Sequence, residues 1–171
     1  MSEIFKTIIG RKIRVAVVGC GRIATRHFAA IQDLKAEISL VAVCDVSTAI
    51  AEEASQTFDC IYYTDFTALI EGEELDCVIL CTPSGLHAKQ TIAAAKRGIN
   101  ILVEKPPSFK FDQFKELYNL SLKKRKYLFV GFNFLYDPAV QLIKKELKNI
   151  GTLYKIDMSY LYGTTLTNIN K

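Results

Sequence analysis

Short runs of apolar, often β-branched residues alternate along the chain with longer stretches in which apolar residues recur every three or four positions. The short runs suit parallel strands buried on both faces, and the longer stretches suit helices with one buried side. The pattern predicts strands at residues 13–18, 38–44, 60–63, 77–81, 100–103 and 127–132. It predicts helices at residues 22–34, 47–58, 65–70, 84–97, 108–126 and 138–148. Such alternation with short connections predicts an α/β fold, a doubly wound parallel sheet with helices on both faces.

The pattern changes at the turn from Asn149 to Gly151. Residues 152–162 alternate loosely and predict one longer strand with no helix after it. We therefore predict an α/β domain over residues 1–149 and the start of a second domain, of α+β type, over residues 150–171. An apolar edge strand without a sheet to pack on tends to pair with another chain, so we expect a homo-oligomer formed through residues 152–162.

The first motif that carries chemistry is G-C-G-R-I-A at residues 19–24, directly after the first predicted strand and at the start of a helix. Gly19 permits a tight turn, and Gly21 lets the backbone approach a pyrophosphate because a Cβ there would clash. Ala24 lets the helix pack closely on the strand. This arrangement predicts a dinucleotide-binding (Rossmann) unit with the pyrophosphate at the helix N-terminus. The alternative is an ordinary glycine turn between strand and helix.

Asp45 ends the second predicted strand, a little more than 20 residues beyond the glycines. An acid at this place accepts hydrogen bonds from both hydroxyls of an adenosine ribose and repels a 2′-phosphate. No arginine follows directly, so the expected cofactor is NAD(H) before NADP(H). The alternative is that Asp45 only caps the next helix.

A third motif, C-T-P-S-G-L-H at residues 81–87, follows the fourth predicted strand, where the sheet order is expected to reverse. Pro83 fixes the turn and Ser84 can cap the helix that follows. His87 falls in the first turn of this helix, on the ligand side of the sheet. It is either a structural histidine or a polar group beside the nicotinamide ribose or the substrate.

The fourth motif is E-K-P-P at residues 104–107, directly after the strand at 100–103. A lysine at the carboxyl end of a parallel strand points into the same crevice and can act as a general acid or base, or bind a substrate oxygen. Two prolines stiffen the turn, and we expect a cis peptide bond before Pro106. The alternative is that Glu104 and Lys105 form a surface pair on a loop.

Composition excludes several other classes of protein. The net charge is only +4, and the densest basic cluster, residues 123–126, suits the last turn of a helix, so we expect neither nucleic acid nor a membrane as a partner. Five cysteines without a C-x-x-C pair indicate reduced thiols rather than disulfides or a metal site. With no signal-peptide pattern and no run of about 18 apolar residues, a cytoplasmic location is expected.

Together these motifs resemble the Gfo/Idh/MocA family, which includes glucose–fructose oxidoreductase and inositol dehydrogenase. The resemblance covers residues 14–162 and rests on the four motifs, on Arg26-His27, on V-G-F-N at 130–133, on D-P at 137–138 and on G-T-L at 151–153. It implies hydride transfer between a nicotinamide and a carbinol carbon of a sugar, inositol or sugar nucleotide.

The resemblance also implies a role for each matching residue. It assigns the cofactor phosphates to Gly19, Gly21, Arg22 and Ile23, the adenosine ribose to Asp45, the flanks of the cofactor to Thr82, Pro83 and His87, and the nicotinamide end to Glu104 and Lys105. In this assignment Lys105 transfers the proton or orients the substrate, and His87 assists it.

Two departures from the family bear on activity. Many members have an arginine where this chain has Phe134-Leu135-Tyr136, and members are roughly twice as long, with a complete second domain. Three hypotheses follow. The chain is a truncated NAD-binding protein that catalyses poorly or not at all, or it is a dehydrogenase in which another chain completes the wall of the substrate pocket. The third hypothesis is a cofactor-sensing or interaction module without chemistry. Turnover separates the second hypothesis from the other two.

Overall fold

The computed structural model describes residues 8–124 and 126–157. The chain divides into two compact units, Met1–Phe132 and Asn133–Lys171. The first unit contains one parallel sheet and the helices that connect its strands. Its strands are β1 (Ile13–Val18), β2 (Ile38–Cys44), β3 (Ile61–Tyr63), β4 (Cys77–Leu80), β5 (Asn100–Val103) and β6 (Leu128–Val130). Its helices are α1 (Ala24–Asp33), α2 (Thr48–Phe58), α3 (Phe66–Gly72), α4 (Ser84–Lys96) and α5 (Phe111–Lys124).

The sheet order is β3-β2-β1-β4-β5-β6, and every neighbouring pair is parallel. The order reverses between β1 and β4, which is where a doubly wound sheet opens a crevice at the carboxyl ends of its strands. The pairing of β1 with β2 shifts register once, because Val15 lies opposite Leu40 and Ala16 opposite Ala42. Val41 is thus an extra residue in β2. The predicted doubly wound parallel sheet is confirmed.

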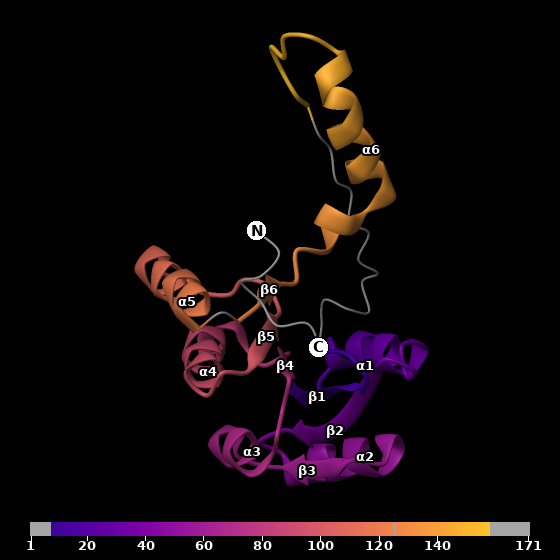
Figure 1. The fold of residues 1–171 in the computed structure, drawn as a ribbon, viewed down its shortest axis with the longest axis vertical. Helices are drawn as coiled ribbons and strands as arrows, with labels where there is room; N and C mark the ends of the chain where they lie inside the picture. The colour runs from indigo at the N-terminus through magenta and orange to yellow at the C-terminus, as the bar shows by residue number, and fades with distance from the viewer. Residues whose placement is uncertain (1–7, 125, 158–171) are drawn as a thin grey trace, which may run out of the picture. The chain divides into compact units, whose positions relative to one another are not determined.

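The helices cover both faces of the sheet, as Figure 1 shows, with α1 and α2 on one side and α3, α4 and α5 on the other. Each face has its own apolar core. Phe28 of α1 and Phe58 of α2 stack at 4.3 Å between ring centres and pack with Val17 and Val43 of the sheet. On the other face, Leu69 of α3 packs with strand and helix residues such as Leu80, Ala94 and Ile101. Because both faces of the sheet are buried, the strand sequences are apolar at consecutive positions and do not alternate with polar residues.

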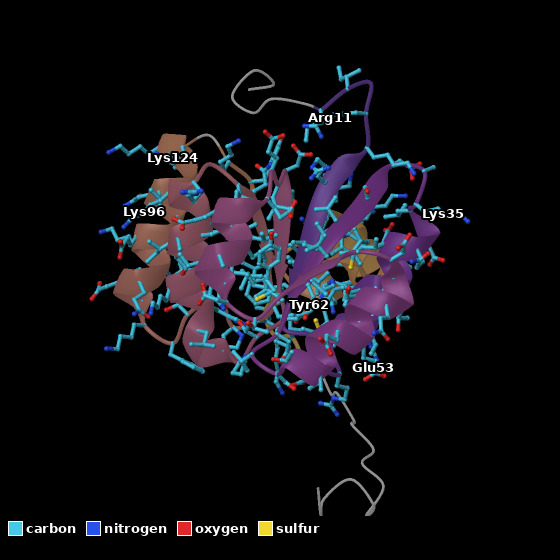
Figure 2. All side chains as sticks on the ribbon, turned by 90° about the horizontal axis from the view of Figure 1, so that it is seen from below. Arg11, Lys35, Glu53, Tyr62, Lys96 and Lys124 are labelled. Carbon is cyan, nitrogen blue, oxygen red and sulfur yellow. The ribbon has the colours of Figure 1, made fainter. Side chains whose placement is uncertain are left out.

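Charged side chains lie on the outer surfaces of these two helical layers. Figure 2 shows Lys96 and Lys124 pointing outward from α4 and α5, and Lys35 and Glu53 on the opposite side of the sheet. Lys123 and Lys124 occupy the last turn of α5, where they complement the negative end of the helix dipole. This placement agrees with the interpretation of the basic cluster as a helix end.

Local signals set the helix ends. Asp65 caps α3 by accepting a hydrogen bond from the N–H of Ala68 at 2.8 Å, and Gly98 follows α4 with φ of +78°. α5 begins at Phe111, three residues later than predicted. The reason is that the Ser108 hydroxyl accepts from the Lys110 N–H at 3.0 Å and so holds these residues in a turn.

The second unit begins with a 3₁₀ turn over Asn133–Tyr136, followed by α6 (Pro138–Glu146) and a second 3₁₀ turn over Leu147–Asn149. Asp137 caps α6, and its carboxylate accepts from the N–H groups of Ala139 and Val140. Residues 152–157 form no strand, and the rest of the strand predicted over residues 152–162 lies outside the described residues. The domain boundary near residue 150 and the oligomer contact through residues 152–162 stay predictions. Within the described part of the chain, no helix could cross a membrane.

Candidate functional site

The carboxyl ends of β1, β2, β4 and β5 bring the sequence motifs together at one edge of the sheet. The glycine motif follows β1, Asp45 follows β2, residues 81–87 follow β4, and Glu104 follows β5. Backbone hydrogen bonds tie these ends to each other, since the Gly19 N–H donates to the Cys44 carbonyl at 2.7 Å and the Cys81 N–H to the Val18 carbonyl at 2.7 Å. Residues that are far apart in the sequence therefore lie at one edge of the sheet.

Gly19 is required at the turn for two independent reasons. Its φ is +85°, a left-handed conformation that side chains rarely adopt. A Cβ at this position would also lie 2.9 Å from the backbone of Cys81 and Thr82. The loops after β1 and β4 thus touch each other, and only glycine leaves room for this contact.

The start of α1 has the features of a phosphate site. Gly21 is exposed, and a Cβ built on it meets no atom within 4 Å, so the space beside it is open to a ligand. Among the described residues the N–H groups of Arg22 and Ile23 donate to no other group, whereas the Ala24 N–H donates to the Gly21 carbonyl. Ala24 is fully buried, as close packing of the helix on the strand requires. Free N–H groups at a helix start suit a pyrophosphate.

Asp45 lies against the glycine turn. Its Oδ2 accepts from the Cys20 N–H and its Oδ1 from the Ser47 N–H, both at 2.9 Å. Ser47 precedes α2 as its cap residue, but its own side chain makes no capping hydrogen bond. A carboxylate has about four acceptor positions, so the two oxygens retain capacity for two hydroxyl donors. The end of β2 thereby presents a fixed carboxylate next to the glycine turn and the start of α1.

The turn after β4 is held by side-chain hydrogen bonds. The Thr82 hydroxyl donates to Gln90 Oε1 at 2.5 Å, and Pro83 is the cap residue of α4. His87 is only 1% exposed, with Nδ1 2.8 Å from the Pro106 carbonyl oxygen and Nε2 2.7 Å from the Thr82 carbonyl oxygen. Both ring nitrogens thus face backbone oxygens. His87 joins the turn after β4 to the turn after β5, and neither nitrogen is left for a ligand.

Glu104 and Lys105 differ in exposure although they are adjacent. Glu104 is 7% exposed, while Lys105 is exposed and forms no ion pair with any described residue. The two do not form the surface pair considered from the sequence. The peptide bond between Lys105 and Pro106 is cis, as predicted. The lysine ammonium is therefore the free charged group at the end of β5.

Sequence reasoning missed the partner of Glu104. His27 Nε2 of α1 lies 2.9 Å from Glu104 Oε1, and both side chains are largely buried. Gly131, which follows β6, also lies close to the carboxylate, because a Cβ there would be 3.2 Å from Glu104 Oε2. Arg26-His27 entered the sequence argument only as part of a motif. No local pattern indicates this contact, since the two residues are 77 positions apart.

The five cysteines are free thiols in and beside the sheet. Burial raises the pKa of Cys20, Cys77 and Cys81 to about 12, and that of Cys44 and Cys60 to about 11. The thiolate is the reactive form, so these side chains are poor nucleophiles near neutral pH. Across the described residues no group of three His, Cys, Asp or Glu side chains is arranged to hold a metal ion.

This gives a prediction for thiol labelling. Iodoacetamide at pH 8 is expected to modify the native protein about 10²-fold more slowly than the unfolded protein, because the folded thiols are almost entirely protonated. Mass spectrometry of the intact chain over time, with and without guanidinium, measures both rates. Rapid modification of any cysteine in the native protein would contradict the burial of that thiol.

The opposite edge of the sheet has a different character. Arg11 contacts Asp76 through both guanidinium nitrogens, at 2.5 and 2.8 Å, and this hydrogen bonding lowers the pKa of Asp76. The Asp76 carboxylate also accepts from the Arg14 N–H at 2.8 Å. The charges of Arg11 and Asp76 are thus paired with each other at this edge.

Comparisons with known proteins agree with this geometry. The protein-family model for GFO_IDH_MocA, described as an oxidoreductase family with an NAD-binding Rossmann fold, matches residues 13–132. The chain is 34% identical over 140 residues to inositol 2-dehydrogenase 4 of Saccharopolyspora erythraea, covering 80% of this chain and 41% of that protein. It is 26% identical over 145 residues to D-glucoside 3-dehydrogenase of Escherichia coli, covering 83% and 41% respectively.

Among solved structures, the chain is similar to the WlbA dehydrogenase of Chromobacterium violaceum in complex with NADH and UDP-GlcNAcA. The TM-score is 0.80 and the identity 34%, over 83% of this chain and 41% of that one. The chain spans about two-fifths of the length of the curated relatives it matches. The similarity therefore concerns the part of those proteins that corresponds to the parallel sheet.

Proposed function

The chain belongs to the Gfo/Idh/MocA oxidoreductase family, whose Rossmann fold binds NAD, and from this premise we propose that it binds NAD(H) at the carboxyl ends of β1, β2, β4 and β5. We further propose that it serves hydride transfer at a carbinol carbon of a sugar, inositol or sugar nucleotide. The relatives act on substrates of this kind: a D-glucoside in one case and inositol in another.

The observation that carries the proposal is the position of Asp45. Its carboxylate is held by the Cys20 N–H, inside the glycine turn, and by the Ser47 N–H at the start of the next helix. The acceptor for a ribose and the donors for a pyrophosphate are thus fixed relative to each other before any ligand binds. A preformed arrangement lowers the ordering cost of binding. The negative charge also disfavours a 2′-phosphate, which supports NAD(H) over NADP(H).

The remaining residues suit the nicotinamide end of the cofactor. Thr82 and Pro83 form the wall after β4, and Glu104 lies buried behind Lys105. When bound, the nicotinamide accepts or supplies the hydride. Lys105, with its free ammonium, is proposed to bind the substrate oxygen and to move the hydroxyl proton. His87 is proposed to assist by positioning, because its ring joins the backbone of Thr82 to that of Pro106.

Calorimetry with NADH and NADPH tests the cofactor site. Wild-type protein is expected to bind NADH more tightly than NADPH, and Asp45→Ala to bind NADH about ten- to a hundredfold more weakly, since hydrogen bonds to a charged acceptor are lost. Asp45→Asn keeps the shape of the side chain but removes its charge, and is expected to reduce the preference for NADH. Exposed Asp33 at the end of α1 provides the control, Asp33→Ala. Binding of neither cofactor by wild type would refute the proposal.

A second candidate function is an NAD-binding module that senses the cofactor or a partner without chemistry. It is favoured by the geometry of His87, whose two ring nitrogens both face backbone carbonyls. Of the two side chains proposed from the sequence to act in catalysis, only Lys105 then has an available ionisable group. A screen of polyols and sugars with NAD⁺, followed at 340 nm, separates the two candidates. Turnover supports the dehydrogenase, whereas NADH binding that alters a partner interaction supports the module.

A further inference from the structure

A largely buried contact joins a histidine and a glutamate at the carboxyl edge of the sheet. His27 is on α1, the helix whose start is proposed to bind the pyrophosphate, and Glu104 follows β5. Their side chains meet at 2.9 Å between Nε2 and Oε1, with side-chain exposures of 18% and 9%. Burying a carboxylate without a hydrogen-bond partner costs free energy. The contact with His27 therefore offsets the cost of burying Glu104.

Gly131 lies against the same carboxylate. A Cβ on this residue would lie 3.2 to 3.3 Å from the Glu104 carboxyl atoms. Gly131 itself is anchored, since its N–H donates to the Val103 carbonyl at 2.9 Å. Gly131 has no positive φ, so a larger residue would not strain the backbone here. It would instead clash with the side chain of Glu104.

These contacts connect the two halves of the sheet. His27 belongs to the half formed by β1, β2 and β3, and Glu104 and Gly131 belong to the half formed by β4, β5 and β6. The backbone joins the same halves between β1 and β4, where the Cys81 N–H donates to the Val18 carbonyl. The contact between the His27 and Glu104 side chains joins the same two halves a second time, at the end of β5.

We propose that His27, Glu104 and Gly131 form a latch that fixes the nicotinamide end of the site without touching the reacting atoms. The latch sets the position of Lys105, the neighbour of Glu104, relative to the start of α1. It acts as a positioning device, because the Glu104 carboxylate is turned towards His27 and Gly131 and is buried. This inference rests on the proposed function, since it assumes that the cofactor lies across the crevice.

The test compares NADH with ADP-ribose, which has the adenosine and pyrophosphate but no nicotinamide. Calorimetry on His27→Ala and on Gly131→Ala is expected to show NADH binding about tenfold weaker than in wild type. ADP-ribose affinity is expected to stay within about twofold, because the glycine turn and Asp45 are unchanged. The conservative His27→Gln, whose amide can still donate to Glu104, is expected to recover most of the NADH affinity. Gly131→Ala disturbs the carboxylate without removing either ionisable side chain.

Exposed Glu71, which pairs with Arg97 at 3.4 Å, provides the matched control, and Glu71→Gln is expected to leave both affinities unchanged. Equal weakening of NADH and ADP-ribose in the latch variants would overturn the inference, because it would indicate a general loss of structure. Unchanged NADH binding would overturn it as well. A wild-type chain that binds neither ligand would instead refute the proposed function on which the latch depends.

Discussion

Replacing Lys105 by alanine is expected to lower the rate of hydride transfer by a factor of about 10²–10⁴, the usual contribution of a group that transfers a proton in the transition state. Lys105 is the exposed, unpaired charge at the end of β5, next to the buried Glu104. Because the lysine is proposed to act on the substrate oxygen and not on the cofactor, NADH affinity should change by less than about threefold. Single-turnover reduction of NAD⁺ at 340 nm measures the rate, and calorimetry measures the affinity.

Lys110 gives the control for this experiment. It is an exposed lysine in the same loop, and Lys110→Ala is expected to leave both the rate and the affinity unchanged. Equal rates in wild type and Lys105→Ala would remove Lys105 from the mechanism. A loss of NADH binding as large as the loss of rate would instead make Lys105 a cofactor ligand.

Replacing Gly19 by alanine is expected to lower the free energy of unfolding by about 2–5 kcal/mol. A left-handed conformation costs an L-residue about 1–2 kcal/mol, and forcing an extra methyl into a packed region typically costs another 1–3 kcal/mol. Here the methyl would meet the rigid backbone of Cys81 and Thr82 at 2.9 Å, and neither loop can move away easily because hydrogen bonds tie each to the sheet. Urea unfolding followed by circular dichroism measures the effect.

Gly21→Ala is the informative counterpart. Nothing lies within 4 Å of a Cβ at this position, and its φ is ordinary, so the stability should change by less than about 0.5 kcal/mol. The methyl would instead enter the space proposed for the pyrophosphate and weaken NADH binding. If both glycine variants were equally destabilised, the assignment of one glycine to the fold and the other to the ligand would be wrong.

The strands were the most predictable part of this fold. The bounds of β1, β2 and β5 coincide with the predicted runs, because each is an apolar sequence buried on both faces and ended by glycine or a charged residue. Helix starts were less predictable. α1 begins two residues later than predicted, since the Ala24 N–H bonds to the Gly21 carbonyl and forms a turn before the helix. The 3₁₀ turn at Asn133–Tyr136 was not predicted, because four residues carry too little periodicity.

The candidate site was predictable where a motif is local and not where it depends on tertiary contacts. The glycine turn and Asp45 follow from spacing within one strand–helix–strand unit. The contact between His27 and Glu104 joins residues 77 positions apart and exists only because β5 lies two strands from β1. The contacts of His87 likewise depend on the carbonyl of Pro106, 19 residues away. Phe134, Leu135 and Tyr136 lie in the second unit, apart from the residues of the sheet unit that form the candidate site.

The extra residue in β2 changes the alternation of side chains at the start of the strand but not the position of its end. Side chains alternate between the faces of a strand, so Val41 shifts the parity of the positions before it relative to those after it. The extra residue is absorbed before the strand ends, because Cys44 again lies opposite Val18, the last residue of β1. The place of Asp45 beside the glycine turn is therefore set by the pairing at the carboxyl end of β2, and not by the number of residues before it. Attempts to exchange cofactor preference by grafting should align β2 segments from this end.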